Sequence, residues 1–506
     1  MAFNWEAGVK PRGPGARGES LAAREPTKHP MFSEHLMEEV VEHHNMQAAL
    51  KQVRANKGSP GVDGMSVDEL PDFLKAHWPE IKDQLLDGTY QPQVIKRVEI
   101  PKPRSQEKRK LGIPCVIDRL IQQAILQVLQ WRWDPTFSEF SYGFRPGRSA
   151  HQAVAQAQSY MEQGYNVVVD MDPEKFFDQV CHDHLMSRLA ERLPDKQLLK
   201  LIRGYLQAGI LADGLVTAPE AGTPQGSPLS PFLSNVVLDE LDKELEARGH
   251  RFCRYADDSN IYVRSLRAGE RVMASISPFI TERLKLKVNE SKSAVDHPQN
   301  RSFLGFSFTG GKSPNRRKIA PKALSRFKTR VKELTRRNQG RSLGQVISTL
   351  SEYLRGWRGY FGFCQTSSVL RDLDRWIRHR LRCLQWKQWM VYRRRKAELI
   401  KRGINPELAH TAAFSAKGPW RISHTPGVRI ALNNQLFDRM GLIRLSAHRR
   451  IEPHSNRHGR DPYAWWCGRG DAEKRLPISI PGDKKDESLC ISRTRVSSER
   501  NGWSSV

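Results

Sequence analysis

Two adjacent carboxylates, Asp257 and Asp258, lie at the centre of a stretch that otherwise has the composition of two short strands. Residues 252–263 run Phe-Cys-Arg-Tyr-Ala-Asp-Asp-Ser-Asn-Ile-Tyr-Val. The aromatic and β-branched flanks favour strands, and Ala-Asp-Asp-Ser supplies the turn between them. Two neighbouring carboxylates repel each other unless a cation lies between them, and Mg²⁺ is the usual cation because it binds few carboxylates together with substrate phosphates. The alternative is a solvated turn, since Asp and Asn are common in turns.

A second acidic segment follows a run of three valines. The chain reads Val167-Val-Val-Asp-Met-Asp-Pro-Glu-Lys-Phe-Phe-Asp178, and the valines predict a strand at 166–171. Asp170 and Asp172 are two residues apart on an extended chain, so they face the same way, about 6.6 Å apart along the strand. A two-metal phosphoryl-transfer site needs carboxylates from separate segments of the chain. We therefore expect this strand to lie beside the Asp257-Asp258 hairpin.

The chain carries a large excess of positive charge, with 82 Lys and Arg against 55 Asp and Glu over 506 residues, a formal net charge of +27. This excess indicates a polyanionic partner, with nucleic acid as the first candidate and an anionic membrane surface as the second. No apolar run approaches the roughly 18 residues that a spanning helix needs, and the N-terminus lacks an apolar leader pattern. We therefore expect a soluble, cytoplasmic protein without a membrane partner.

The seven cysteines are scattered and form no Cys-x-x-Cys pair. Neither a zinc knuckle nor a disulfide framework is therefore indicated, and free thiols in a reducing cytosol are expected. His182 and His184 flank Asp183 in the pattern of a metal pair. No further cysteine or histidine cluster completes that pattern, so we reject a metal site there.

Apolar spacing and turn residues divide the chain into helices and strands. In the predicted helix that starts near Ser227, this serine is the cap and Pro228 lies in the first turn. Because strands and helices alternate without regular βαβ spacing, the fold class is α+β, and beyond about residue 320 the chain becomes helical and very basic. The remaining predicted elements are helices at 36–56, 118–133 and 227–249 and a hairpin at 94–113.

Several short motifs, taken in order, give the chain a clear resemblance to reverse transcriptases. It is most similar to the reverse transcriptase/maturase proteins encoded by bacterial group II introns, and the similarity covers about residues 45–445. The motifs that carry it are Gly58-x-x-Gly-Val-Asp-Gly64, Ile100-Pro-Lys-Pro103 with Leu111-Gly-Ile-Pro114, Ser141-Tyr-Gly-Phe-Arg-Pro-Gly-Arg148, Asp172-x₄-Phe-Asp178, Gly222-Thr-Pro-Gln-Gly-Ser-Pro-Leu-Ser230, Tyr255-Ala-Asp-Asp258, Leu284-x-Leu-x₂-Asn289-x₂-Lys292, Phe303-Leu-Gly-Phe306 and Gly356-Trp-Arg-Gly-Tyr-Phe361.

The resemblance implies a right-hand polymerase of fingers, palm and thumb with an antiparallel palm sheet, followed by a basic helical maturase region. The implied divisions are a mobile arm at 1–30, fingers and palm at 31–310, a thumb/maturase region at 311–415, a possible DNA-contacting remnant at 416–445, and a disordered tail at 446–506. Larger members end in a zinc-associated His-Asn-His nuclease with Cys-x-x-Cys pairs. Because this sequence contains no such pair, we do not expect second-strand cleavage of a target site.

By register with the family, Asp172, Asp257 and Asp258 would be the catalytic triad and would hold two Mg²⁺ ions. Asp172 fits the first-strand position because Phe177 and Asp178 then follow five and six residues later. Asp170 would be a supporting or structural carboxylate, and whether it contributes to the metal site stays open.

The resemblance also places Phe177 under the incoming sugar, where it would exclude a 2′-hydroxyl and favour dNTPs; the alternative is ordinary core packing. Gln225 and Gly226 would line the template–nucleotide pocket. Because Gly226 has no side chain, its backbone is free to approach a base pair closely.

Three cations are candidates for contacts with the triphosphate. Lys102 and Arg109, on the predicted 94–113 hairpin and its loop, would clamp the phosphates through charge-assisted hydrogen bonds; the alternative is two more surface cations. Lys292 resembles the lysine that protonates departing pyrophosphate, a general-acid role. A solvated lysine is the alternative.

Residues 371–402 contain twelve Lys or Arg against three acidic residues. The resemblance makes this region the one that grips intron RNA, and phosphate contact is favoured over a merely solvated face. Trp376, Trp386, Trp389 and Tyr392 either stack on bases or pack internally. Four arginines step by four, three and four residues along one helical face: Arg371, Arg375, Arg378 and Arg382. The opposite, apolar stripe consists of Leu370, Leu373, Ile377, Leu381 and Leu384.

These features together predict an RNA-directed DNA polymerase that copies intron RNA into DNA and also binds that RNA to promote splicing and mobility. Its partners would be group II intron RNA, a DNA primer or target, and dNTPs. The sequence identifies neither the cognate intron nor an oligomeric state. The alternatives are a splicing-only maturase and a reverse transcriptase recruited to phage defence. The intact acidic triad argues against the first, and the maturase-like helical region argues against the second.

Overall fold

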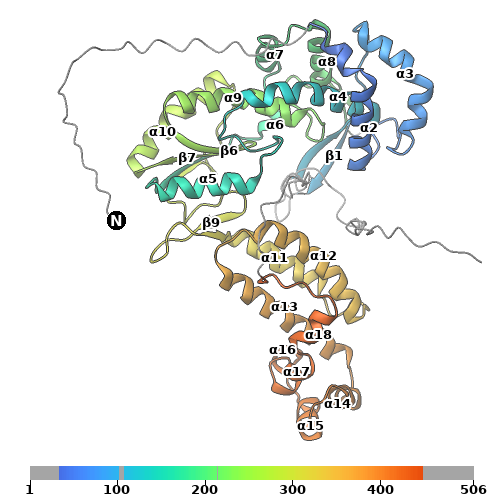
Figure 1. The fold of residues 1–506 in the computed structure, drawn as a ribbon, viewed down its shortest axis with the longest axis vertical. Coiled ribbons are helices and arrows are strands. Elements are labelled where there is room, and N and C mark those ends of the chain that lie inside the picture. Colours follow the sequence, from blue (N-terminus) through green and yellow to red (C-terminus); the bar gives the residue numbers. More distant parts are fainter. Residues whose placement is uncertain (1–33, 102–107, 213–214, 448–506) are drawn as a thin grey trace, which may run out of the picture. The chain divides into compact units, whose positions relative to one another are not determined.

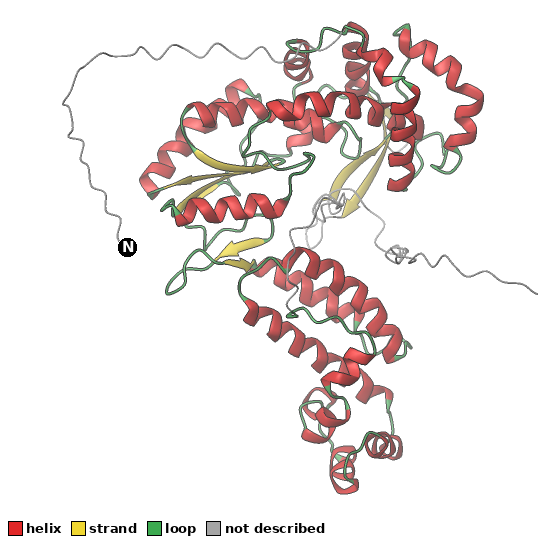
Figure 2. Cartoon of the chain, in the orientation of Figure 1, coloured by secondary structure: helices red, strands yellow, loops and turns green. Residues whose placement is uncertain are grey.

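The computed structural model describes residues 34–101, 108–212 and 215–447, in which helices and strands are interleaved (Figures 1 and 2). One four-stranded sheet, here called the palm sheet, has the strand order β6-β7-β3-β8. Each neighbouring pair in it is antiparallel, which confirms the predicted antiparallel palm. Its strands are β3 (Val167–Met171), β6 (Arg251–Tyr255), β7 (Asp258–Val263) and β8 (Ala294–Asp296).

The two faces of the palm sheet are buried by different helices, because side chains alternate between the faces with a period of two. Val167 and Val169 belong to the main core with residues of α9 (Ser230–Ala247) and α10 (Leu266–Pro278). Val168 and Tyr262 instead pack with α5 (Ala150–Glu162). Figure 1 shows α5 and α10 on opposite sides of the strands. Burial on both faces leaves the strand ends as the accessible part of this sheet.

A second four-stranded sheet, here called the finger sheet, contains the hairpin predicted at 94–113. Its order is β2-β1-β4-β5, with β1 and β2 antiparallel and β1 and β4 parallel. The register sets Lys96 opposite Ile113 and Ile100 opposite Arg109. The strands are β1 (Ile95–Pro101), β2 (Lys108–Ile113), β4 (Ile210–Ala212) and β5 (Leu215–Thr217).

Two predicted helices have different bounds in the structure. The helix predicted at 36–56 is interrupted at Val41 and Glu42, where the Asn45 side-chain amide donates to the Val40 carbonyl at 2.9 Å. The helix predicted from Ser227 begins at Ser230; the Ser227 hydroxyl bonds to Gln122 and also accepts a hydrogen bond from the Leu229 amide at 3.3 Å. The helices of this part are α1 (Leu36–Val40), α2 (His43–Asn56), α3 (Leu70–Leu86), α4 (Val116–Trp133), α6 (Phe176–Gln179), α7 (His182–Ala190) and α8 (Lys196–Gln207), with α5, α9 and α10 given above.

Beyond residue 310 the described chain is helical apart from β10 (Arg317–Ile319), which pairs with β9 (Phe306–Phe308). A separate set of buried side chains, from Ile319 to Leu445, forms its core. The predicted boundary at 310/311 remains a prediction. No helix in the described ranges is long and apolar enough to cross a membrane. The helices are α11 (Pro321–Leu334), α12 (Leu343–Phe361), α13 (Ser367–Gln388), α14 (Tyr392–Lys401), α15 (Pro406–Phe414), α16 (Pro419–Ile422), α17 (Pro426–Ala431) and α18 (Asn434–Arg439).

His379, on α13, is one of the few buried ionisable groups of this helical core. Its ring lies 3.6 Å from that of His424, centroid to centroid, and its Nδ1 lies 2.9 Å from the Ser423 hydroxyl. Burial, followed by the positive charges of His424, Arg382 and Arg380, lowers the pKa of His379 to about 4. The folded chain therefore holds this imidazole neutral.

Acid should destabilise the helical region through His379. The pKa of His379 is lower in the folded chain than the unfolded value of 6.5. Its contribution to the free energy of unfolding is therefore fully present above pH 6.5 and is lost as the pH falls from 6.5 towards 4. The unfolding equilibrium should shift by up to about tenfold per pH unit in that window. Thermal unfolding of wild type and His379→Gln between pH 7 and 4 tests this, and equal pH slopes for the two proteins would contradict it.

Candidate active site

The β6–β7 hairpin turns more tightly than the sequence predicted. Tyr255 pairs directly with Asp258, so the turn consists of Ala256 and Asp257 alone, and Asp258 is the first residue of β7. Ala256 has a left-handed backbone with φ of +56°. This conformation costs a non-glycine residue roughly 1–2 kcal/mol, so surrounding contacts must stabilise it. Asp257 thus lies at the tip of the hairpin, beside Asp258 at its edge.

The register of the palm sheet brings Asp172 to the same place. β3 pairs with β7 antiparallel, and Met171 is opposite Ser259. One further step in that register sets Asp172 opposite Asp258. The three residues of the predicted triad therefore meet at neighbouring strand ends, and each is partly exposed.

The carboxylates at these strand ends influence one another electrostatically. Burial, and then the negative charges of Asp257, Asp172 and Asp170, raise the pKa of Asp258 to about 8. The Lys292 ammonium acts in the opposite direction. Its Nζ lies 2.7 Å from Asp172 Oδ2, and this hydrogen bond is the main reason that the pKa of Lys292 is raised. The site thus gathers negative charge and engages the Lys292 ammonium.

Asp170 and Asp172 differ in their partners. The Arg301 guanidinium binds Asp170 Oδ2 through Nη2 at 2.6 Å and Nε at 3.0 Å, and its Nη2 also bonds to the Lys292 carbonyl. Burial raises the pKa of Asp170, and Arg301 opposes that shift. Asp170 is therefore neutralised by a guanidinium, whereas Asp172 faces Lys292 and the hairpin.

The carboxylates at the strand ends are the groups that would bind a metal ion at this site. Carboxylate oxygens suit hard divalent cations, and after burial the neighbouring negative charges of Asp257, Asp172 and Asp170 are what raise the pKa of Asp258. Within the ranges that the structure describes, no three His, Cys, Asp or Glu side chains are arranged to coordinate one ion. The residue types fit a divalent cation, and Lys292 contacts Asp172 in this arrangement.

The two histidines in the rejected metal pattern have separate partners. His182 is buried and its Nε2 lies 2.7 Å from the Gly222 carbonyl, while His184 Nε2 lies 3.4 Å from Glu240 Oε1. Both histidines lie on α7, and each contacts a different segment of the chain.

The loop at 222–226 joins Phe177 to the finger sheet. The Thr223 amide donates to the Phe177 carbonyl at 2.6 Å, and the Gly112 amide of β2 donates to the Gln225 carbonyl at 2.9 Å. Gly226 has a φ of +124°, and a Cβ atom there would lie 2.6 Å from the Gly112 carbonyl oxygen. Gly226 is therefore required by contact with β2, a reason that the sequence did not reveal.

The remaining nucleotide-site candidates are placed as follows. Phe177 is half-buried on α6, edge-on to Phe176 with centroids 5.4 Å apart, and packs against the main core. Arg109 lies in β2 opposite Ile100. Lys102 lies outside the described residues, as do the predicted arm at 1–30 and most of the predicted tail.

The four arginines predicted on one face of α13 differ in their solvent exposure. Arg371 and Arg375 are exposed and Arg378 is half-buried, but Arg382 is only 9% exposed. Arg382 Nε donates to the Leu432 carbonyl at 2.8 Å, so this guanidinium is committed to the helical core. Trp386 and Trp389 are also buried, which resolves their two alternatives in favour of packing. The predicted apolar stripe of α13 is buried at every position: Leu370, Leu373, Ile377, Leu381 and Leu384.

Four buried or half-buried side chains around the hairpin escaped the sequence interpretation: Asn235, Asp242, Arg254 and Arg301. A signal existed for three of them. Arg254 is a charged residue between Phe252-Cys253 and Tyr255 in a predicted strand, and a charge buried there requires a partner. Asn235 and Asp242 are seven residues apart on α9, two turns along one face.

Comparison with known proteins agrees with this geometry. The family described as reverse transcriptase (RNA-dependent DNA polymerase) matches residues 100–308, and the group II intron maturase-specific domain matches residues 324–402. The chain belongs to the reverse transcriptase family and carries a group II intron maturase-specific domain. A reverse transcriptase domain implies a polymerase that depends on divalent metal and acts on nucleic acid.

Several named relatives share the matched region. The chain is 32% identical to Protein YkfC of Escherichia coli (strain K12), over 51% of this chain and 76% of that protein. It is 28% identical to the group II intron-encoded protein LtrA of Lactococcus lactis subsp. cremoris, over 51% of this chain and 54% of LtrA. The match thus spans about half the length of LtrA. A solved partial Cas6-RT-Cas1–Cas2 complex matches 49% of this chain and 43% of that chain at 27% identity, with a TM-score of 0.33.

Substitution of Gly226 should test the junction between the 222–226 loop and β2. Gly226→Ala adds a Cβ against the Gly112 carbonyl as well as backbone strain, whereas Gly164→Ala adds strain at φ +92° with no atom within 4 Å. We expect Gly164→Ala to cost about 1–2 kcal/mol in free energy of unfolding. Gly226→Ala should cost about 1–3 kcal/mol more. Urea denaturation measures both, and equal destabilisation of the two variants would contradict a tight junction.

Proposed function

We propose that the chain is an RNA-directed DNA polymerase that copies group II intron RNA into DNA and also binds that RNA to promote its splicing and mobility. The observation that carries this proposal is the meeting of Asp172, Asp257 and Asp258 at neighbouring ends of β3 and the β6–β7 hairpin. The membership of the reverse transcriptase family and the maturase-specific domain support it.

The catalytic residues in this proposal are Asp172, Asp257 and Asp258, which would hold two Mg²⁺ ions. When bound, such ions supply a lowered pKa for the primer hydroxyl and charge stabilisation for in-line phosphoryl transfer. The pairing of Asp170 with Arg301 supports Asp172 as the first-strand ligand. Lys292 contacts Asp172 at 2.7 Å, so its ammonium would lie near a substrate phosphate held by metal ions on these carboxylates.

The nucleotide would lie between the palm carboxylates and the finger sheet. The 222–226 loop bonds to both sides: the Gly112 amide of β2 donates to the Gln225 carbonyl, and the Thr223 amide donates to the Phe177 carbonyl. These bonds would form one side of the nucleotide site. We assign Phe177 to discrimination against a 2′-hydroxyl and Gln225 and Gly226 to the template–nucleotide pocket. Lys102 and Arg109 are proposed as the triphosphate clamp, and Lys292 as the general acid for pyrophosphate.

RNA contact is proposed for Arg371, Arg375 and Arg378 on α13, the helix inside the maturase-specific match. Exposure of the first two supports phosphate contact, whereas Arg382 is assigned a structural role because of its bond to Leu432. The template and ribonucleoprotein partner would be group II intron RNA, with a DNA primer or target and dNTPs as the other substrates. We place this activity in the cytoplasm, at the nucleoid when the target DNA is engaged.

The boundaries of these activities follow the predicted divisions: fingers and palm at 31–310, a thumb/maturase region at 311–415 and a possible DNA-contacting segment at 416–445. The separate core from Ile319 to Leu445 supports a boundary near 310. A splicing-only maturase is the second candidate, and the maturase-specific match favours it over a role in phage defence.

Replacement of the triad should abolish DNA synthesis. Asp257→Asn and Asp172→Asn should each lower primer extension on an RNA template with dNTPs and Mg²⁺ by about 10³-fold or more, since each removes several kcal/mol of transition-state charge stabilisation. Asp170→Asn, a matched change two residues from Asp172, should stay within about tenfold of wild type. Wild type that extends nothing yet supports splicing would instead favour the splicing-only candidate.

The exposed arginines of α13 should contribute to RNA affinity through phosphate contact. Arg371→Ala/Arg375→Ala should weaken intron RNA binding and reduce the slope of log K against log[salt] by about 0.7–0.9 for each phosphate that is no longer neutralised. Arg271→Ala, an exposed arginine on α10, serves as the control and should leave the slope unchanged. Filter binding at several salt concentrations measures the slopes, and an unchanged slope in the double variant would remove α13 from the RNA interface.

A further inference from the structure

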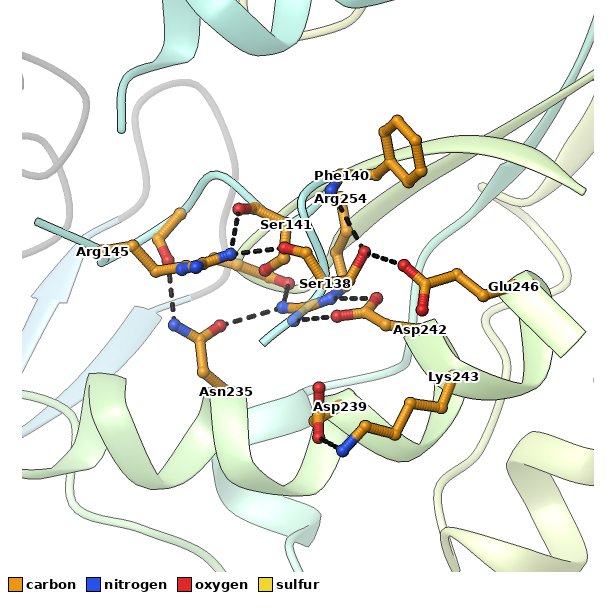
Figure 3. Close-up of polar contacts among 12 residues, drawn as sticks. Ser138, Phe140, Ser141, Arg145, Asn235, Asp239, Asp242, Lys243, Glu246 and Arg254 are labelled. Carbon is orange, nitrogen blue, oxygen red and sulfur yellow. Dashed lines mark hydrogen bonds and ion pairs between the residues drawn. The ribbon is translucent and has the colours of Figure 1, made fainter. Parts of the chain in front are cut away.

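The strand that leads into the Asp257 turn contributes one partner of a fully buried ion pair, and α9 contributes the other. Arg254 and Asp242 are both 0% exposed. The pair is bidentate: Arg254 Nε donates to Asp242 Oδ1 at 2.7 Å and Nη2 donates to Asp242 Oδ2 at 2.6 Å (Figure 3). A buried ion pair is in general no more stabilising than an apolar pair of the same volume. Its presence here therefore calls for a reason other than stability.

The third guanidinium nitrogen of Arg254 reaches the turn itself. Nη1 donates to the Ala256 carbonyl at 2.9 Å and to Asn235 Oδ1 at 2.9 Å. Ala256 is the left-handed residue directly before Asp257. The arginine thus fixes the one peptide whose orientation decides where the two carboxylates point, while Asp242 fixes the arginine.

Asn235 connects the same turn to a second segment of the chain. Its Nδ2 donates to the Gly143 carbonyl at 2.9 Å. A Cβ atom on Gly143 would lie 2.2 Å from the Ala256 nitrogen, so the two backbones are in direct contact. The backbone of Arg254 also pairs with this segment, to the Phe140 carbonyl and from the Tyr142 amide, both at 2.9 Å. In Figure 3 Asn235 lies on α9 below Arg254, with the 138–145 segment alongside.

We propose that Asn235, Asp242 and Arg254 form a positioning cluster that sets the backbone of Ala256 and thereby aims Asp257 and Asp258 for metal binding and nucleotidyl transfer. The inference rests on the proposed polymerase function. Arg254 acts on the carboxylates through the Ala256 peptide, and Asp242 and Asn235 act through Arg254. Asn235 also acts through Gly143, whose backbone contacts that of Ala256.

The test compares two neighbouring positions on α9. Asn235→Ala removes the bonds to Arg254 and Gly143, whereas Ser234→Ala removes a hydroxyl that is equally buried but bonds only within the helix, to Ser230 at 2.8 Å. We expect Asn235→Ala to lower kcat for primer extension by about 10–100-fold with little change in KM for template–primer. It should also raise the Mn²⁺ concentration for half-saturation by about tenfold or more, measured by electron paramagnetic resonance on the full chain. Ser234→Ala should change neither value.

Three further variants identify the metal signal and separate positioning from folding. Asp257→Asn should abolish the Mn²⁺ signal assigned to this site. Arg254→Met/Asp242→Leu replaces the buried pair with apolar side chains, and it should regain thermal stability relative to Arg254→Met without regaining kcat or Mn²⁺ affinity. Recovery of all three properties in the double variant would show that the pair is only structural and would overturn the inference.

The outcomes also distinguish this inference from the function on which it rests. Active wild type together with Asn235→Ala indistinguishable from Ser234→Ala overturns the inference alone. Wild type that neither extends a primer nor binds Mn²⁺ overturns the proposed function, and the inference with it.

Discussion

Repulsion between carboxylates at the ends of β3 and β7 is the constraint on which the rest of the site depends. Asp258 has its pKa raised to about 8 by burial and by Asp257, Asp172 and Asp170, so this arrangement disfavours its own ionised form. Such an arrangement persists only if the backbone holds it, because the side chains alone would move apart. The antiparallel register of β3 and β7 supplies that restraint, and the valines buried on both faces of β3 fix the register.

Much of this framework was predictable because it depends on local patterns. A valine run between polar segments predicts a strand, and aromatic flanks around Ala-Asp-Asp-Ser predict a hairpin. Two details differ from the predictions. The turn is two residues long because Tyr255 pairs with Asp258, so the Ala-Asp-Asp-Ser segment indicated the hairpin but not its exact register. The helix α9 begins at Ser230, and the Ser227 hydroxyl bonds to Gln122, more than a hundred residues away, a partner that no local pattern contains.

The same distinction explains the candidate residues. The identity of the acidic residues follows from the motif, and register with the family favours Asp172 over Asp170. The pairing of Asp170 with Arg301, which lies 131 residues away in the sequence, could not be predicted from that motif. Likewise, a glycine at 226 suggested close approach to a base pair, whereas the described contact is with the Gly112 carbonyl. These two explanations are compatible, because a loop that contacts β2 on one side leaves its other side for the proposed template–nucleotide pocket.

The arginines discussed above differ in role according to their solvent exposure. Arg254, Arg301 and Arg382 are buried or half-buried, and each has its guanidinium engaged by carboxylate, carbonyl or amide oxygens of the protein. A buried guanidinium has fixed donor directions and therefore suits the orientation of a backbone or a carboxylate. Arg371 and Arg375 are exposed, with Arg375 in a solvent-exposed ion pair with Asp372 at 3.2 Å, and they are the arginines proposed to contact RNA phosphates. The helical periodicity predicted Arg382 on the same face as these two. Its end of α13 is buried in the helical core, so one helix carries both exposed and buried arginines.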